Sequence, residues 1–274
     1  MGYNSAAFKM TKHLFNVFVL LIAMPAFVWA QQQPDSVTIT VEGVSFKMIC
    51  VQGGTFTMGA TSEQGSDAYD DEQPVHKVTL STYYIGETEV TQELWKAVMG
   101  NNPSHFVSLN HPVEEVSWDD CQKFIIKLNQ LTGKNFRLPT EAEWEFAARG
   151  GMKSVGYRYS GSNDIHDVAW FADNAYLKSD NSPDYGTHDV KTQIPNELGI
   201  YDMSGNVWEW CSDWYGNYSS ASRTNPQGAS AYSYRVVRGG SWYSNAKYCR
   251  SSCRGISSPS YRFSILGFRL VLFP

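Results

Sequence analysis

The stretch RGGSWYSNAKYC, residues 238–249, places Ser244 five residues ahead of Cys249 in a glycine-led turn. A cysteine at such a turn could serve redox chemistry through its thiolate. The alternative is an ordinary buried loop, because a free cysteine commonly packs as a small hydrophobic residue. The residues of this stretch leave both interpretations open.

The other cysteines do not decide between them. The chain contains Cys50, Cys121, Cys211, Cys249 and Cys253, and an odd number leaves at least one thiol without a disulfide partner. Cys249 and Cys253 would face each other in a helix, but the serines and the glycine around Cys253 disfavour one. A strained disulfide between the two, or another partner for Cys253, stays open.

A second candidate site lies in GIYDMSGNVWEW, residues 199–210. Asp202 and Glu209 are hard oxygen ligands, and Gly205 permits a sharp turn that could aim the carbonyls of Gly205 and Val207 at a calcium ion, with Glu209 bidentate. The spacing alone favours the other interpretation, a turn held by side-chain hydrogen bonds.

Several functions lack their sequence signals. The six histidines form no pair at helical spacing, which argues against a histidine-built zinc or iron site. The chain has no Gly-Lys-Ser/Thr phosphate loop and no Gly-x-Ser-x-Gly elbow. A net charge of −5 without a basic stripe provides no footprint for nucleic acid.

Three helices are predicted to position these segments. Thr91 and Ser117 are expected N-caps of helices that end at Gly100 and Gly133. In RLPTEAEWEFAARGG, residues 137–151, Thr140 and Glu143 have the spacing of a capping box.

Outside these helices the chain has the pattern of short strands and tight turns. Residues 36–59 alternate apolar and polar side chains around Gly43 and Gly53-Gly54, and no convincing helix follows Gly151. The final strand is expected to pair with this early hairpin. One α+β domain over residues 44–272 is the prediction.

Residues 1–30 have the features of a secretory signal peptide. Basic residues precede an apolar run that ends in Val28-Trp29-Ala30, and glutamines follow. We expect cleavage after Ala30 rather than a membrane anchor, because Pro25 interrupts a run that is short for a spanning helix. The mature chain would then be a periplasmic or secreted protein without an integral membrane span.

Seven segments together resemble the sulfatase-modifying-factor family, which includes the formylglycine-generating enzyme. In chain order they are GGTFTMG (53–59), HKVTLSTYYIGETEVT (76–91), PVEEVSWDD (112–120), RLPTEAEWEFAARGG (137–151), GIYDMSGNVWEW (199–210), RGGSW (238–242) and GFRL (267–270). The resemblance spans nearly all of the chain after residue 30. It implies the formylglycine-generating-enzyme fold, a C-type-lectin-like variant with much irregular structure.

The resemblance also implies site residues. Asp202, Gly205, Val207 and Glu209 match the positions that hold a structural calcium ion in the family. Ser244 and Cys249 match two cysteines that bind copper(I) and convert a cysteine of an unfolded sulfatase segment to formylglycine. Ser241 and Trp208 match residues that line the family's active-site groove, where a protein or peptide substrate would bind.

The substitution at Ser244 separates two functional hypotheses. A neutral hydroxyl is a poor ligand for copper(I), so the copper-dependent oxidase activity is doubtful in this chain. The first hypothesis is an exported protein-modifying enzyme of the family. The second is a non-catalytic binding or assembly module on the same scaffold, as in the family's gliding-motility members.

Overall fold

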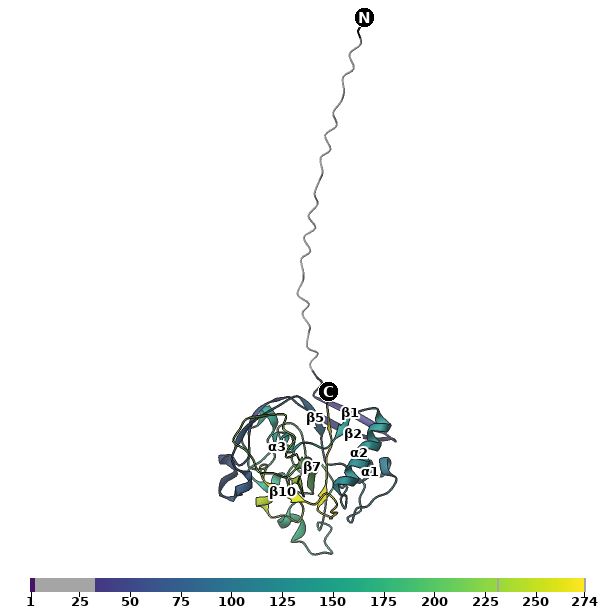
Figure 1. Cartoon of the computed structure of the whole chain (residues 1–274). Coiled ribbons are helices and arrows are strands. Elements are labelled where there is room, and N and C mark those ends of the chain that lie inside the picture. The colour runs from purple at the N-terminus through teal and green to yellow at the C-terminus, as the bar shows by residue number, and fades with distance from the viewer. Residues whose placement is uncertain (3–32, 231, 274) are drawn as a thin grey trace. The chain divides into compact units, whose positions relative to one another are not determined.

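The computed structural model describes residues 1–2, 33–230 and 232–273. Residues from Gln33 onward form one compact unit (Figure 1). The expected signal peptide falls almost entirely outside the described residues. Within them, no helix has the length and apolar character needed to cross a membrane.

The strands form three sheets. The five-stranded sheet has the order β1-β2-β5-β12-β6, the four-stranded sheet β10-β9-β7-β11 and the three-stranded sheet β3-β4-β8. The strands are β1 (Ser36–Val41), β2 (Val44–Val51), β3 (Gly54–Met58), β4 (His76–Leu80), β5 (Tyr83–Gly86), β6 (Phe136–Arg137), β7 (Trp208–Trp214), β8 (Arg223–Thr224), β9 (Arg235–Arg238), β10 (Arg254–Ser257), β11 (Leu266–Gly267) and β12 (Val271–Leu272). The first sheet thus includes β1, which precedes the expected domain start at Val44.

The three predicted helices are confirmed: α1 (Gln92–Met99), α2 (Trp118–Thr132) and α3 (Glu141–Ala148). Each begins at its expected cap, because the hydroxyls of Thr91, Ser117 and Thr140 accept a hydrogen bond from the backbone N–H three residues later. Each cap occupies an otherwise unpaired N–H at a helix start. Gly100 and Gly133 end α1 and α2 in the left-handed conformation that glycine adopts readily.

The final strand pairs differently from the expectation. β12 lies between β5 and β6, so β5 separates it from the hairpin formed by β1 and β2. Strand order depends on side-chain packing across the whole sheet, which alternation within one segment does not encode. The end of the chain still closes the sheet that the early hairpin begins.

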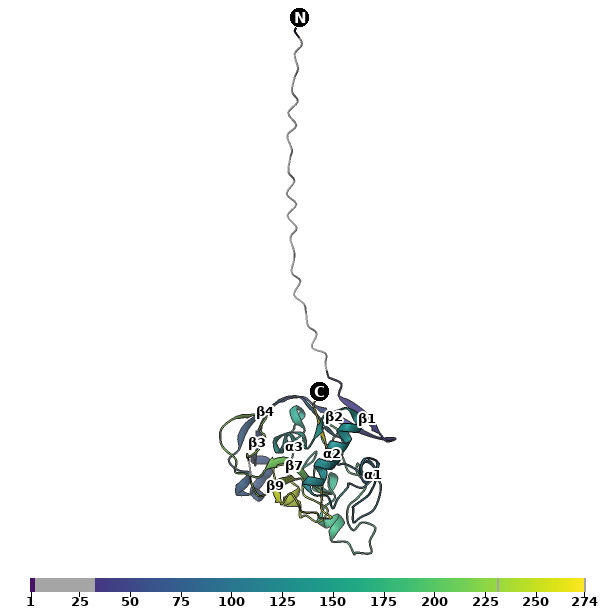
Figure 2. The same ribbon diagram turned by 45° about the vertical axis from the view of Figure 1, so that its right-hand side comes forward.

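The helices pack on different sheets. α1 and α2 lie against β1 and β2 of the five-stranded sheet, whereas α3 packs against β3, β7 and β9 (Figure 2). All eight residues of α3 are buried, including three glutamates. A helix buried on every side must pair its charged groups inside the protein, and this requirement shapes the centre of the fold.

Beyond α3, helix is confined to single turns among the described residues. They include η5 (Ala172–Tyr176) and η6 (Ala246–Cys249). This agrees with the expectation of irregular structure after Gly151. Backbone hydrogen bonds join the two candidate segments: the N–H of Gly205 donates to the Gly239 carbonyl, and the N–H of Trp242 donates to the Asn206 carbonyl, both at 2.8 Å.

Candidate functional site

The turn that carries Ser241 and Ser244 begins where β9 ends. Gly239 and Gly240 adopt φ values of 98° and 73°, and both lie against buried groups. A side chain at Gly240 would collide with the sulfur of Cys249, 2.6 Å from the position of an added Cβ. Glycine at this position therefore lets the turn approach Cys249 closely.

Ser241 and Ser244 form a pair of hydroxyls. Their Oγ atoms lie 3.0 Å apart, and the Ser241 N–H also donates to the Ser244 Oγ at 3.1 Å. The Ser244 carbonyl accepts from the N–H of Ala172, which ties the turn to η5. Both serines are buried, so their hydrogen bonds hold the turn in one conformation.

Cys249 lies in an apolar environment at the end of η6. Its side chain is fully buried in a cluster with Tyr159, Ile165, Val168 and Phe171. Burial raises the pKa of the Cys249 thiol well above its ordinary value, and the neighbouring Cys253 adds to the rise. A thiol that stays protonated is a weak nucleophile and a weak metal ligand.

Cys253 lies four residues further on, beyond the end of η6. Burial raises the pKa of this thiol to about 12. All five cysteines are free thiols, so the structure contains no Cys249–Cys253 disulfide. Since η6 ends at Cys249, the intervening segment does not provide the helical spacing that would make the two cysteines face each other.

Trp208 begins β7 beside the candidate calcium segment. Its indole lies against Gly255, where an added Cβ would come within 3.0 Å of the ring. The side chain is partly buried and packs on the main hydrophobic core. Trp210, two residues later on the same face of the strand, is fully buried, as expected for a core residue.

A surface cluster of aromatic side chains surrounds Trp242, the residue after Ser241. It consists of Phe106, Tyr176, Tyr185, Trp242 and Tyr243, and is called here the aromatic cluster. The ring of Trp242 lies 5.1 Å from that of Phe106 and 5.2 Å from that of Tyr185, centroid to centroid. Tyr243 retains 49% of its accessible surface. Because its rings come from three distant segments, no local pattern predicted this cluster.

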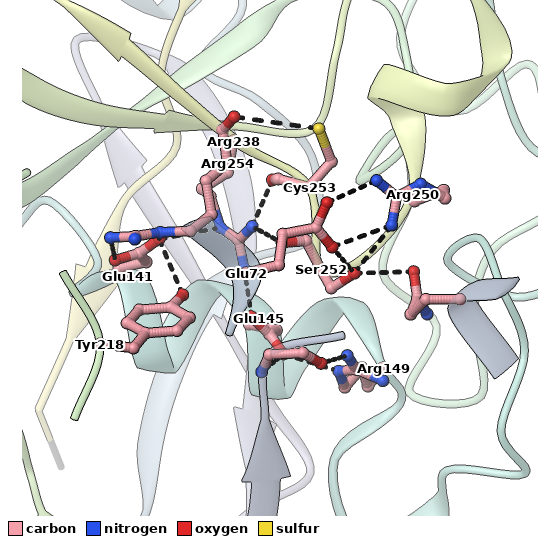
Figure 3. Close-up of polar contacts among 12 residues, drawn as sticks. Glu72, Glu141, Glu145, Arg149, Tyr218, Arg238, Arg250, Ser252, Cys253 and Arg254 are labelled. Carbon is pink, nitrogen blue, oxygen red and sulfur yellow. Dashed lines mark hydrogen bonds and ion pairs between the residues drawn. The ribbon is translucent and has the colours of Figure 1, made fainter. Parts of the chain in front are cut away.

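Two glutamates of α3, Glu141 and Glu145, enter a buried network of ion pairs (Figure 3). Glu145 pairs with Arg238 and with Arg149, whose Nε lies 2.9 Å from the carboxylate, and accepts the N–H of Gly59 at 2.9 Å. Glu141 holds Arg254 through two hydrogen bonds of 2.6 and 2.9 Å.

A second part of this network joins the acidic loop to the segment after Cys249. Glu72 binds Arg250 at 2.5 and 2.9 Å and accepts from the hydroxyl of Ser252 at 2.5 Å. The acidic residues 70–72 thus contribute one fully buried carboxylate. Arg250 and Arg254 are the sequence features that could have indicated this network, because buried glutamates need positively charged counter-ions.

Comparison with known proteins identifies the fold. A family profile described as the sulfatase-modifying factor enzyme 1-like domain matches residues 39–273. The chain belongs to the sulfatase-modifying-factor family. The α+β fold of the formylglycine-generating-enzyme type, expected from the seven segments, is confirmed.

Relatives in this family carry several names. The chain is 36% identical to "Chaperone protein LppX" of Paenibacillus barcinonensis, over 77% of this chain and 84% of that protein. It is 30% identical to the "Formylglycine-generating enzyme" of Streptomyces coelicolor, over 79% and 86%. Among solved structures, "Treponema denticola variable protein 1" superposes with a TM-score of 0.78 at 36% identity, covering 88% of this chain and all of that one.

The segment that matches the family's calcium positions is buried and acidic. Arg269 binds both oxygens of Glu209 at 2.6 Å, and the indole N–H of Trp144 donates to Glu209 at 2.8 Å. Asp202, at φ 58°, accepts the N–H of Lys191 at 2.9 Å.

A third carboxylate, Glu89, completes this acidic group. It accepts from the N–H of Val207 at 3.2 Å and from the side chain of Asn206 at 3.0 Å. Burial, followed by repulsion from Asp202 and Glu209, raises the pKa of Glu89 well above its usual value. Burial also raises the pKa of Asp202 to about 6. The positive charges that act on these carboxyl groups are those of Arg269 and, at Asp202, Lys191.

The negative charge of this group suits a calcium ion, but the position of Glu209 does not. A cation would relieve the repulsion among the carboxylates. A bidentate contact from Glu209 would require Arg269 to leave both of its oxygens. Across residues 33–230 and 232–273, no three histidine, cysteine, aspartate or glutamate side chains are placed to hold a metal ion.

Proposed function

We propose that this chain is an exported, non-catalytic binding domain of the sulfatase-modifying-factor family. The observation that carries the proposal is the pair of positions that match the family's copper ligands. One position holds the hydroxyl of Ser244, hydrogen-bonded to Ser241. The other holds Cys249, fully buried among apolar side chains. Two thiolates suit copper(I), whereas a hydroxyl and a protonated thiol do not.

The aromatic cluster supports a binding role for the surface beside these serines. Exposed tyrosines contribute strongly to protein interfaces because their large rings are rigid and can both pack and form hydrogen bonds. We infer that the partner is a polypeptide. The relative named a chaperone supports this partner class, since 36% identity links the two chains.

Copper(I) titration tests the non-catalytic assignment. The mature wild-type protein is expected to bind no stoichiometric copper(I) against a competing chelator, and a Cys-x-Pro-x-Arg peptide should not be converted to formylglycine. Ser244→Cys should raise the copper(I) affinity at least about tenfold, because it adds the second soft ligand.

A separate binding assay tests the aromatic cluster. Binding of a reduced, unfolded polypeptide should weaken in Tyr243→Ala and not in the control Tyr232→Ala.

Tight copper(I) binding by the wild type, lost in Cys249→Ala, would instead establish the enzymatic alternative. Cys249→Ala in the Ser244→Cys background is the matched control, because it should remove the gained affinity. Equal loss of polypeptide binding in Tyr243→Ala and Tyr232→Ala would contradict a role for the aromatic cluster.

We also propose a structural calcium ion held by Asp202, Gly205, Val207 and Glu209, whose binding would displace Arg269 from the Glu209 carboxylate. The excess of buried carboxylates over arginine in this segment supports it. Chelation by EGTA is expected to lower the melting temperature by at least about 4 °C, because a ligand of the native state stabilises it. Glu209→Gln should abolish this sensitivity. A melting temperature that chelation leaves unchanged would contradict the calcium site.

A further inference from the structure

A cavity of about 320 Å³ opens where α3 begins and β7 ends. Its volume lies at the lower end of the range for small-molecule sites, roughly 300–1,000 Å³. Residues from six segments line it, among them His76, Glu141, Asp213, Trp214, Tyr218 and Arg254. Neither the serine turn nor the aromatic cluster contributes to its wall, so it is a separate site.

Asp213 is a buried acidic group in this wall. The residue retains only 3% of its accessible surface. Its Oδ2 accepts the N–H of Glu141 at 3.1 Å and the hydroxyl of Ser212 at 2.9 Å. Within the described residues, Oδ1 accepts no hydrogen bond. This oxygen lies beside Gly228, where an added Cβ would come within 2.9 Å of it.

Two arginines near Asp213 are held by other groups, and a third, Arg223, is exposed at the cavity wall. Arg254 holds both oxygens of Glu141. Arg235 on β9 stacks between Trp118 and Trp214, at 3.8 and 3.5 Å from their ring centroids, and donates to the Ser212 carbonyl at 2.6 Å.

The remaining charged and titratable groups complete this environment. Glu141 and Glu143 on α3 repel Asp213, and His76 and Arg223 lie in the cavity wall. Burial and the repulsion from Glu141 raise the pKa of Asp213 to about 7. An ionised Asp213 accepts two hydrogen bonds and interacts with the charge of Arg235, but it forms no ion pair within the described residues. A buried charge without an ion pair is costly inside a protein.

The other walls suit an apolar stem. Met58, Ala142, Trp214, Pro226 and Ala229 line the cavity together with the polar groups. A ligand with one cationic end could place it at Oδ1 and lay its chain along these side chains. One free oxygen suits an ammonium group better than a guanidinium, which prefers both oxygens of a carboxylate. An anionic ligand would be repelled by the carboxylates of Asp213 and Glu141 in the cavity wall.

We propose that this cavity binds a primary ammonium group on an unbranched alkyl chain, with Oδ1 of Asp213 as its counter-ion. The ligand could be a lysine side chain of a polypeptide or a free alkylamine, which share this chemistry. Neither source requires the aromatic cluster.

Calorimetric titration with n-butylammonium chloride tests the site, with 1-butanol as the uncharged control. The wild type should bind butylammonium and not butanol. Binding should be about thirtyfold tighter at pH 8 than at pH 5.5, because only the ionised form of Asp213 is competent. Asp213→Asn, which keeps the shape of the side chain, should weaken binding at least about tenfold. Asp180→Asn removes an exposed charge elsewhere and should have no effect.

Two further measurements complete the test. Circular dichroism melting shows whether Asp213→Asn is folded, and at pH 7 the wild type should release protons on binding in buffers of different ionisation enthalpy. Tighter binding of N-acetyl-lysine methylamide than of butylammonium identifies a lysine side chain as the source, and the reverse order a free amine. Equal binding of butanol and butylammonium, or unchanged binding in Asp213→Asn, would overturn the proposal.

Discussion

Replacing Glu145 with alanine is expected to lower the free energy of unfolding by about 3–5 kcal/mol. The carboxylate of Glu145 is fully buried and meets Arg149, Arg238 and the N–H of Gly59. Its removal leaves Arg238, also fully buried, without its nearest counter-ion. Chemical denaturation followed by tryptophan fluorescence measures the loss.

An exposed ion pair provides the control for this variant. Lys123 lies 3.2 Å from Asp120 on α2 and is largely solvent-exposed. Lys123→Ala should change the unfolding free energy by less than about 1 kcal/mol, since water screens such pairs. A similar loss in both variants would show that burial does not govern the Glu145 network.

Replacing Arg269 with methionine is expected to cost a comparable amount, about 3–5 kcal/mol at pH 8. Arg269 is the buried cation that both oxygens of Glu209 contact, with Glu89 and Asp202 close enough to interact. The loss should shrink at pH 5. At that pH, the raised pKa values of Asp202 and Glu89 keep these carboxyl groups protonated, so fewer unpaired charges remain.

A second substitution separates lost charge balance from lost packing. Adding Glu209→Gln to Arg269→Met should recover part of the stability at pH 8, because it removes a carboxylate that no longer has a partner. Glutamine can still accept the hydrogen bond from the Trp144 indole. If the double variant is as unstable as the sum of the two single variants, the interpretation as a charge effect is wrong.

Local chemistry made the helices predictable. Thr140 and Glu143 are three residues apart, and the capping box that they form needs no contact from elsewhere in the chain. The same holds for the glycine stops of α1 and α2. The family was also predictable, because seven segments in one order are specific even when each is short.

The position of the last strand was predicted only in part. The apolar residues of β12 indicated a strand, but its neighbours β5 and β6 lie far from it along the chain. Which strands become neighbours depends on how side chains fill the space between sheets and helices. The segment alone favoured a strand without selecting its partner.

The candidate sites also combine features that the sequence predicts with features that only the tertiary structure decides. From the sequence, Ser244 was recognised as a departure from the two cysteines of the family, and Cys249 as a lone thiol near it. The sequence alone also determined the α+β fold, its helix boundaries and the segments that belong to the family. Only the tertiary structure surrounded Cys249 with apolar side chains, gathered the aromatic cluster and, within the described residues, left Oδ1 of Asp213 without a hydrogen bond. Helix caps act over a few residues, whereas burial and charge pairing depend on groups more than 100 residues apart in the chain, such as Glu141 and Arg254.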